Sequence, residues 1–441
     1  MMTGTALDPE LARPGFDADY LDQLLARGIQ VVRIVHSDLF GRQRGKQYPV
    51  DRLLSLTKGT GYSKMSNAED LLGVPVSAGE FPALATHPDL QAFPDVDTAF
   101  VPPWEPDSLW VLSRLVEGST PSALCPRSQL SGAAEQLRAT LGLTAVAAGE
   151  PEFYLFRTDG DGATPYASRG VSYTMDRITD PEGSVGRIHR QLIGMNIGVT
   201  AVNREFSPGQ FEINLDHSPV QDAADAAFLL KTGVKELAVL ENLQANFMAK
   251  PSTREEGSSL HVHLSLWDGD SNVFATSNGG LTETARAAIA GIQAHANAIM
   301  AFAAPTVNSY KRLTGEGLSP RVSSWGEDDR FAFVRVPAER GNATRIELRA
   351  GDASASPHLL MAAMLHAARD GIARGLVPDP DGHPLPRSLR DSIAALETDE
   401  ALRAGFGDEL VEVYAAIKRR EVDAFESTVT DWEWNLYGPQ V

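Results

Sequence analysis

The chain has 441 residues, of which 43% are hydrophobic and 22% are charged, and its formal net charge at pH 7 is −19. This length is sufficient for a large buried core and about two domains, and the negative charge argues against general nucleic-acid binding. No stretch approaches the roughly 20 apolar residues of a membrane span, and the single cysteine, Cys125, cannot form an internal disulfide. We therefore expect a cytoplasmic protein with no nucleic-acid or membrane partner.

The first third of the chain is predicted to be rich in strands. Residues 1–15 lack the apolar core of a signal peptide, and we interpret them as a flexible tail. Apolar spacing predicts a helix over 18–27, and β-branched residues predict strands over 30–36 and 108–114. Glycine and serine predict a loop over 59–70.

A domain boundary is predicted at the turn-forming sequence Gly118-Ser119-Thr120-Pro121. It divides the chain into a small N-terminal domain, residues 16–118, and a larger domain, residues 119–441. The larger domain is predicted to alternate helices with strands that carry polar residues on one face. Helices are expected over 126–141, 188–195, 221–247, 282–302, 357–376 and 407–425, strands over 144–156 and 260–266 and within 199–215, and loops over 308–320 and 325–330.

This order of elements predicts an α+β architecture. Strands with one polar face form an antiparallel sheet, and the opposite face of the sheet packs on helices. A concave polar face of this kind is a natural site for metal and phosphate chemistry.

One short sequence, Arg345-Ile346-Glu347-Leu348-Arg349, illustrates the polar face. Alternate residues of a strand share a face, so Arg345, Glu347 and Arg349 are expected to point the same way. Neighbouring guanidiniums keep the carboxylate ionised, which makes it a good metal ligand and a poor general base. Taken alone, the pattern equally fits a surface strand with a ladder of salt bridges.

Further strands add inward-facing acids and histidines. Glu150 and Glu152 lie two residues apart within an apolar run, and side-by-side carboxylates repel one another unless a cation lies between them. Glu212 shares a face with Gln210 and Asn214, after Glu205. His261 and His263 share one face of the next strand.

The combined set indicates divalent-metal and phosphoryl-transfer chemistry. Five carboxylates and one imidazole favour Mg²⁺ or Mn²⁺ over zinc, and arginines stabilise charge on transferring phosphoryl oxygens. No Walker or GxGxxG sequence is present to bind the nucleotide. The candidate metal ligands are Glu150, Glu152, Glu205, Glu212, His261 and Glu347, and the candidate arginines are Arg312, Arg330, Arg335, Arg345 and Arg349.

Six sequence motifs, in order along the chain, resemble those of the glutamine synthetase family, type I-like. They are Gly-Glu-Pro-Glu-Phe at 149–153, Pro-Gly-Gln-Phe-Glu-Ile-Asn at 208–214 with Glu205 before it, Phe-Met-Ala-Lys-Pro at 247–251, Gly-Ser-Ser-Leu-His-Val-His at 257–263, Asn-Ser-Tyr-Lys-Arg-Leu at 308–313, and the stretch 345–357.

The resemblance implies a fold, an assembly and a chemistry. The fold is a β-grasp N-terminal domain followed by a catalytic domain with a curved antiparallel sheet, a half-barrel, and flanking helices. The assembly is a homo-oligomer of hexameric rings, as a dodecamer, with active sites shared between subunits. The chemistry uses ATP, glutamate, an amine and two or three Mg²⁺ or Mn²⁺ per site, and proceeds through γ-glutamyl phosphate.

The resemblance also implies roles for individual residues. Arg312 and Arg349 would bind the glutamate carboxylates, Arg330 would stabilise the transferring γ-phosphate, and Arg335 and Arg345 would contact nucleotide phosphates. The remaining residues divide into one metal group of Glu152, Glu205 and Glu212, a second metal group of Glu150, His261 and Glu347, a glutamate-site residue Gly257, and two nucleotide-side residues, His263 and Ser265.

The sequence departs from the family at the positions that bind and deprotonate ammonium. Ser63 stands where ammonium-using members have an aspartate, and Leu318 stands where they have a glutamate before Ala-Pro. Glu256 replaces an asparagine that contacts glutamate, and Glu316 lies two residues before Leu318. Losing two acids removes the charge that concentrates a small cation and adds apolar contact.

The changes at these positions resemble those of the γ-glutamylpolyamine and γ-glutamylmonoamine synthetases. The leading hypothesis is an ATP-dependent glutamate–amine ligase of amine catabolism or detoxification, whose amine is a polyamine or a small monoamine such as ethanolamine. An ammonium-using glutamine synthetase is the first alternative. A non-catalytic regulatory or assembly protein of the same fold is the second, and the intact set of metal ligands and arginines argues against it.

Overall fold

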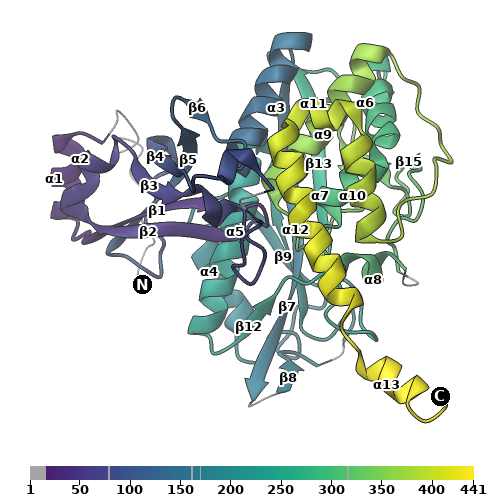
Figure 1. The fold of residues 1–441 in the computed structure, drawn as a ribbon, viewed down its shortest axis with the longest axis horizontal. Helices are drawn as coiled ribbons and strands as arrows, with labels where there is room; N and C mark the ends of the chain where they lie inside the picture. The colour runs from purple at the N-terminus through teal and green to yellow at the C-terminus, as the bar shows by residue number, and fades with distance from the viewer. Residues whose placement is uncertain (1–15, 78–79, 160–161, 169, 315–316) are drawn as a thin grey trace.

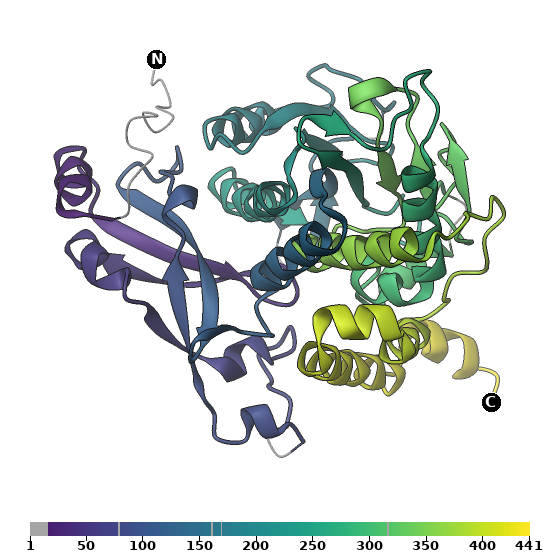
Figure 2. The same cartoon turned by 90° about the horizontal axis from the view of Figure 1, so that it is seen from above.

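The structure of the chain, a computed structural model, describes residues 16–77, 80–159, 162–168, 170–314 and 317–441. Within these residues the strands form two sheets, one at the N-terminal side and one in the larger body (Figures 1 and 2). The predicted flexible tail, residues 1–15, lies outside the described residues. No helix in the described ranges is both long and apolar enough to cross a membrane.

The N-terminal sheet has six strands in the order β2-β1-β5-β4-β3, with β6 paired to β5. Its central pair, β1 and β5, is parallel, and the neighbouring pairs are antiparallel. This mixed sheet with short helices is consistent with the expected β-grasp domain. The elements are α1 Ala18–Ala26, β1 Val31–Ser37, β2 Gln43–Pro49, α2 Leu53–Leu56, β3 Thr60–Ser63, β4 Asp89–Pro94, β5 Ser108–Glu117 and β6 Thr120–Pro121.

The larger sheet has eleven strands, with the main order β15-β16-β17-β13-β7-β10-β9. Its pairs are antiparallel except β15 with β16, which is parallel and departs from the fully antiparallel prediction. The strands are β7 Thr144–Asp159, β8 Gly162–Pro165, β9 Val199–Arg204, β10 Gln210–Leu215, β11 Ser218–Pro219, β12 Gln244–Asn246, β13 Leu260–Asp268, β14 Ser271–Asn272, β15 Trp325–Glu327, β16 Val334–Val336 and β17 Ile346–Leu348.

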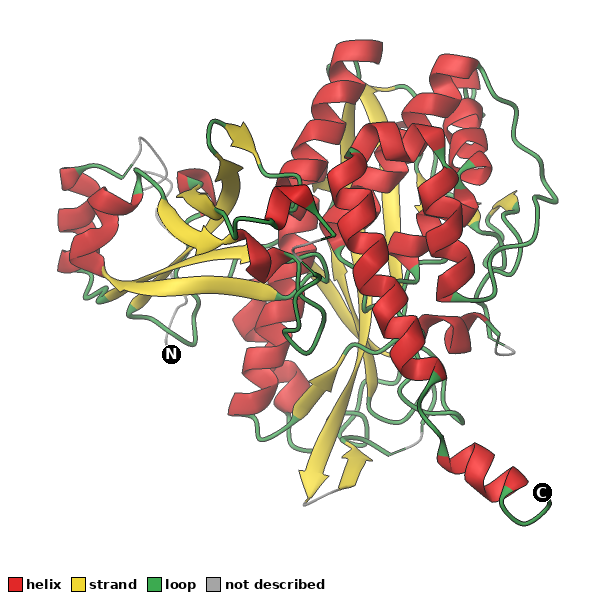
Figure 3. Cartoon of the chain, in the orientation of Figure 1, coloured by secondary structure: helices red, strands yellow, loops and turns green. Residues whose placement is uncertain are grey.

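Helices flank this sheet, and α9 and α12 lie in front of its strands in Figure 3. The predicted α+β architecture, with a curved sheet and flanking helices, is therefore confirmed. The helices are α3 Pro126–Leu141, α4 Ser184–Ile193, α5 Val220–Leu240, α6 Glu283–Ala294, α7 Ala296–Ala303, α8 Ser309–Leu313, α9 Pro357–Arg374, α10 Leu389–Thr398, α11 Glu400–Phe406, α12 Asp408–Glu426 and α13 Asp431–Tyr437.

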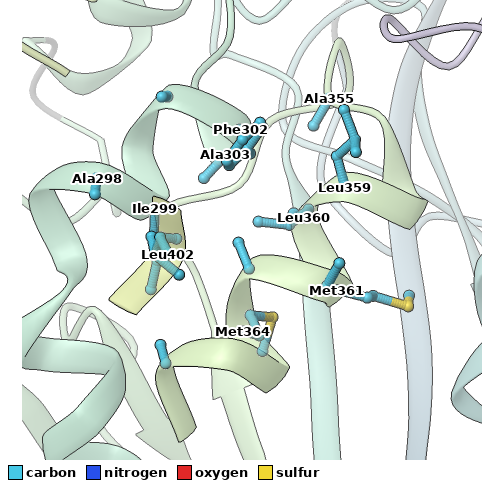
Figure 4. Packing of buried hydrophobic residues seen from close by; sticks show 14 of the residues in the cluster. Ala298, Ile299, Phe302, Ala303, Ala355, Leu359, Leu360, Met361, Met364 and Leu402 are labelled. Carbon is cyan, nitrogen blue, oxygen red and sulfur yellow. The ribbon is translucent and has the colours of Figure 1, made fainter. Parts of the chain in front are cut away.

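The main hydrophobic core lies between the sheet and α9. Residues 357–368 of α9 are all buried, and Leu359, Leu360 and Met364 pack against residues of α7 and α11 (Figure 4). The crossing of α6 and α9 is very close, because a Cβ added to Gly291 would lie 2.1 Å from the carbonyl oxygen of Ala367. Such dense packing holds the loop before α9 rigidly beside the strands.

Several predicted loops contain regular structure. Within 59–70, Thr60–Ser63 forms β3 and pairs with β4, and the side chain of Tyr62 is buried. The predicted loops 308–320 and 325–330 contain α8 and β15. In each case pairing or packing with a distant part of the chain outweighs the local preference of polar residues for turns.

Two predicted long helices are shorter than expected. The helix expected over 221–247 ends at Leu240, after which Asn242 adopts a positive φ of 56° and the chain enters β12. The helix expected over 282–302 is divided at His295 into α6 and α7. Apolar spacing continues through both breaks, so periodicity alone does not reveal them.

Candidate active site

A cavity of about 540 Å³ lies on the polar face of the larger sheet. Cross-strand partners of an antiparallel sheet place their side chains on the same face, and the register pairs His261 with Glu150, Glu212 with Glu152, and His263 with Glu347. The cavity therefore gathers every predicted metal ligand and every predicted arginine, namely Glu150, Glu152, Glu205, Glu212, His261, Glu347, Arg312, Arg330, Arg335, Arg345 and Arg349.

Glu150, His261 and Glu347 form a first group of possible metal ligands, in agreement with the expected grouping. Their ligand atoms all lie within 4.8 Å of one another. His261 Nδ1 is 3.7 Å from Glu150 Oε2 and 3.8 Å from Glu347 Oε1. These separations are too long for direct hydrogen bonds and suit atoms that share a cation.

Glu152, Glu212 and His261 form a second group within the same 4.8 Å limit. The sequence predicted Glu205 in place of His261 here. Glu205 follows β9 and lines the cavity, and its Oε1 accepts a hydrogen bond from Asn203 Nδ2 at 2.7 Å. The backbone therefore brings Glu205 to the cavity but outside this close group.

Two of these acids have raised pKa values. Burial and the nearby carboxylate of Glu152 raise the pKa of Glu205 to about 7. Burial and repulsion from Glu152 and Glu150 raise the pKa of Glu212 to about 9. A cation bound among them would offset this repulsion and favour the ionised carboxylates.

Glu150 and Glu347, which lie nearer the histidines and arginines, have lowered pKa values. Burial by itself would raise the pKa of Glu150, but His261 and His263 lower it. Burial likewise opposes ionisation of Glu347, whereas His261, His263 and Arg349 lower its pKa. These two carboxylates are thus ionised at neutral pH. An oxygen-rich donor set with one imidazole fits Mg²⁺ or Mn²⁺.

Glu347 lies between two of the predicted arginines. Arg335 Nη1 is 2.9 Å from Glu347 Oε2, and Arg349 Nη1 pairs with Glu347 Oε1. Arg349 also donates through Nε to the carbonyl oxygen of Arg330 at 3.0 Å. The carboxylate is therefore held between cations: Arg349 is one that the alternation of the strand predicted, whereas the other is Arg335 in place of Arg345.

The other three arginines have different environments. Arg312 is buried and donates from Nη1 to the carbonyl oxygen of Ala350 at 3.0 Å. Arg345 donates from Nε to His263 Nδ1 at 3.2 Å. Arg330 is exposed, and its side chain makes no hydrogen bond with any residue in the described ranges. Its guanidinium is consequently available to an anion in the cavity.

Gly257 lines the cavity, and a larger residue would not fit at its position. A Cβ at Gly257 would lie 2.5 Å from the carbonyl oxygen of Ala249 and 2.7 Å from Arg312 Cγ. Its own carbonyl oxygen accepts a hydrogen bond from Gln210 Nε2 at 3.0 Å. The glycine thus permits the close approach of Arg312.

His263 and Ser265 mark an adjoining cavity. His263 lines the main cavity and also a neighbouring one of about 350 Å³, which Glu150 and Arg345 share. Ser265 lines only the neighbouring cavity and accepts a hydrogen bond from Trp267 Nε1 at 2.9 Å. The two predicted nucleotide-side residues therefore continue the site away from the metal groups.

Of the two residues predicted to select the amine, Leu318 lines the main cavity and Ser63 does not. Leu318 lines the main cavity and is 38% exposed. Ser63 is exposed at the end of β3 and is not among the described residues that line the cavity. Glu256 lines the cavity, whereas Glu316 lies outside the described residues.

Sequence reasoning missed the polar residues that orient the acids. The backbone N–H of Ser259 donates to Glu152 Oε2 at 2.9 Å, and Asn203 holds Glu205. The Gly-Ser-Ser sequence before β13 was a possible signal for Ser259. Nothing in the sequence marks Asn203, because its contact depends on how the chain bends after β9.

Comparison with known proteins identifies relatives over most of the chain. The family described as the glutamine synthetase catalytic domain matches residues 123–437. A glutamine synthetase of Methanocaldococcus jannaschii is 30% identical, covering 95% of this chain and 97% of that protein. A glutamate–isopropylamine ligase of a Pseudomonas species is 32% identical, covering 94% and 96%.

Solved structures agree with these sequence matches. The structure of a GmaS/ADP complex has a TM-score of 0.84 and 29% identity with this chain, covering 95% of this chain and 99% of its own. A structure of GmaS without ligand has the same TM-score and covers 96% and 99%. The similarity thus extends over both sheets.

Proposed function

Since the chain belongs to the glutamine synthetase family, we propose that this ATP-dependent ligase joins the γ-carboxylate of glutamate to an organic amine rather than to ammonium. The observation that carries the proposal is Leu318, an apolar residue in the wall of a cavity otherwise rich in acids. Ammonium needs anionic partners that concentrate and deprotonate it. An alkylamine instead gains from apolar contact with its carbon chain.

The carboxylate of Glu256 could bind a second polar group of the amine substrate. A Cβ at Gly317, the residue before Leu318, would lie 2.9 Å from Glu256 Oε2, so this carboxylate adjoins the Leu318 segment. The aromatic side chains of Tyr173 and Phe206 line the same cavity. The distal ammonium of a polyamine would pair with Glu256, while a monoamine such as ethanolamine would place its carbon chain against Leu318.

Two relatives suggest two different amines. The Pseudomonas protein is named for isopropylamine, an organic amine, which favours the proposal. The Methanocaldococcus protein is named glutamine synthetase, which favours ammonium. The position of Leu318 favours the organic amine.

The proposed reaction has two steps. A γ-carboxylate oxygen of glutamate attacks the γ-phosphorus of ATP, and the bond to the β-phosphate oxygen breaks, giving γ-glutamyl phosphate and ADP. The amine nitrogen then attacks the acyl carbon, phosphate leaves with the bonding electrons, and the nitrogen loses one proton. The products are the γ-glutamyl amide, ADP and phosphate.

We assign the cavity residues to these steps as follows. Arg330 has a free guanidinium to stabilise charge on the transferring phosphoryl group, and Arg335 and Arg345, which line the same cavity, would contact the nucleotide phosphates. Arg312 and Arg349 hold the glutamate carboxylates. The groups Glu150–His261–Glu347 and Glu152–Glu212–His261, with Glu205 beside them, would hold Mg²⁺ or Mn²⁺. When bound, these cations supply charge neutralisation at the phosphates.

We further propose a homo-oligomer of hexameric rings, assembled as a dodecamer, in which active sites are shared. Ser63 does not line the cavity of its own chain, so its action on an amine would require a neighbouring subunit. Helix α13 projects from the body in Figure 1, and its Trp432 and Trp434 are largely exposed. Apolar side chains on a projecting helix suit contact with another subunit. A monomer in light scattering would contradict this assembly.

Phosphate release with glutamate, ATP and a panel of amines tests the proposed activity. We expect putrescine, ethanolamine or a short alkylamine to support faster release than ammonium at equal concentration. Faster release with ammonium would identify a glutamine synthetase. No glutamate-dependent release with any amine would favour the non-catalytic alternative.

A further inference from the structure

A second cavity, of about 420 Å³, lies beside the strand that leads into the active site. Its walls come from residues 175–180, helix α4 and strands β9 and β10. Asn203 lines both this cavity and the active-site cavity. The wall between the two cavities is therefore the end of β9.

Arg204 in this wall has an incomplete set of hydrogen bonds. Its side chain is buried, with 2% relative exposure, and Nη2 donates to the carbonyl oxygen of Ser168. Its Nε and Nη1 atoms are buried and have no hydrogen-bond partner among the residues that the structure describes. Burying two N–H donor atoms of a guanidinium without acceptors is costly, so their presence beside a cavity indicates that an acceptor enters there.

Further cations surround the cavity. Arg177 and Arg190 line it, are exposed, and form no ion pair with a residue of the described ranges. Within the described ranges, Arg204, Arg177 and Arg190 therefore form no ion pair with a carboxylate.

The two aspartates of the lining are held by backbone groups. Asp180 accepts from the N–H groups of Val185 and Gly186 at 3.1 and 2.9 Å, at the start of α4. Asp176 accepts from the N–H of Thr179 at 3.0 Å. These hydrogen bonds fix both carboxylates on local turns, so neither aspartate neutralises Arg204 by direct contact.

Beside the polar side chains of Thr179, His189 and Asn203, the lining has an apolar part. Val185, Val202 and Phe211 face the cavity from α4, β9 and β10. Apolar walls favour a ligand with a hydrocarbon body, whereas a small inorganic ion would leave them in contact with water.

We infer that this cavity binds a small organic anion, whose carboxylate or phosphate group pairs with Arg204 and whose hydrocarbon part packs on Val185, Val202 and Phe211. Charge-assisted hydrogen bonds from a guanidinium fork suit such a group. The site is separate from the catalytic cavity but close to it. Arg204 directly precedes Glu205, and the carbonyl oxygen of Arg204 accepts a hydrogen bond from the N–H of Tyr173 at 3.0 Å; both Glu205 and Tyr173 line the catalytic cavity.

Calorimetric titration of the full chain with glutarate and with inorganic phosphate, at constant ionic strength, tests the inference. We expect saturable binding of glutarate that is tighter than that of phosphate. Arg204→Gln should weaken it by about tenfold or more, and Arg190→Gln or Arg177→Gln should weaken it to a smaller extent. The last two substitutions are at exposed positions, so they test the site even if Arg204→Gln does not fold.

Two control variants locate the bound anion. Arg138→Gln, at an exposed position on α3, should leave glutarate binding unchanged, and so should Arg349→Gln in the active site, where Arg349 is assigned to the glutamate carboxylates. Loss of binding in Arg349→Gln but not in the other variants would place the anion in the active site and overturn the inference. Absence of saturable glutarate binding, or phosphate binding as tight as glutarate binding, would also overturn it.

Discussion

Arg330 differs from the other arginines of the cavity because its guanidinium is exposed and not already bonded within the described part of the chain. If it acts on the transferring phosphoryl group, its contribution arises mainly in the transition state. We expect Arg330→Ala to lower kcat by about two orders of magnitude or more while nucleotide affinity changes little. Phosphate release and calorimetric nucleotide binding measure the two quantities.

Arg330→Lys is the matched variant for this prediction. It keeps the charge but loses the planar fork, so we expect it to retain part of the rate that Arg330→Ala loses. An unchanged kcat in Arg330→Ala would remove Arg330 from the mechanism. A loss confined to nucleotide affinity would instead make it a binding residue.

Leu318 is the residue at which the choice of amine can be tested by one substitution. Leu318→Glu adds a carboxylate to the cavity wall beside Glu256, where it would attract ammonium and accept its proton. We expect the ratio of kcat/KM for ammonium to that for an alkylamine to rise by about tenfold or more. Leu318→Met, which stays apolar, should keep the original preference. An unshifted ratio in Leu318→Glu would mean that this position does not determine specificity.

At the scale of the elements, His295 joins three helical segments. It separates α6 from α7, its Nε2 is 3.0 Å from Asp370 of α9, and its Nδ1 is 2.7 Å from Asp399, the residue that caps α11. Burial by itself would lower the pKa of His295, but the two aspartates raise it above the usual value. The protonated histidine thus links the helices that pack in front of the sheet.

The raised pKa of His295 predicts the sign of a pH dependence. A folded-state pKa above the unfolded value gives stability that is fully present below about pH 6.5 and is lost as pH rises through the folded-state pKa. We expect His295→Gln to reduce the free energy of unfolding more near about pH 6 than near about pH 9, as measured by urea denaturation. His217→Gln, at an exposed position, is the control. A larger effect at the higher pH would contradict the assignment.

Sequence periodicity predicted those elements whose own residues determine them. α3 matches its predicted span because Pro126 starts it and Gly142, with a φ of 72°, ends it. Strand alternation placed Glu150, Glu212 and His261 on one face, as the register shows. The breaks at Asn242 and His295 were missed, because tertiary contacts select them and the apolar pattern runs through both.

The residues of the site, like the elements, could be predicted only in part from the sequence. Residue type and alternation selected six acids and histidines that all line the cavity, and their role as metal ligands stays a prediction. Which three converge was not fully predicted, since His261 and not Glu205 joins Glu152 and Glu212. That detail depends on the curvature of the sheet and on the bend after β9.

At the scale of the whole molecule, Arg127 connects the two sheet systems. On α3, its Nη2 is 2.9 Å from Asp225 of α5, and its Nη1 is 2.9 Å from Asp95, which follows β4 of the N-terminal sheet. His358 Nε2 is 2.8 Å from the same Asp225. The guanidinium is almost fully buried, so it holds charges from both parts of the chain in one network.

Removing this buried cation should destabilise the whole molecule. Breaking a buried ion pair leaves an uncompensated charge and costs about 3–5 kcal/mol, so we expect Arg127→Met to lower the free energy of unfolding in urea by that order. Arg138→Gln on the same helix removes an exposed pair with Glu135, which solvent screens, and should lower the free energy of unfolding far less. Equal effects of the two substitutions would contradict the role of Arg127 between the domains.

The central claim concerns the whole molecule, because Leu318 lies in the cavity and Ser63 would have to come from a neighbouring subunit. The most direct test gives the assembled enzyme ATP, Mg²⁺, glutamate and equal concentrations of ammonium and an organic amine in one vessel, and measures the two products by mass spectrometry. With putrescine, ethanolamine or isopropylamine in turn as the competitor, we predict that with at least one of them the γ-glutamyl amide of the organic amine exceeds glutamine. Glutamine as the main product against every one of these amines would contradict the claim.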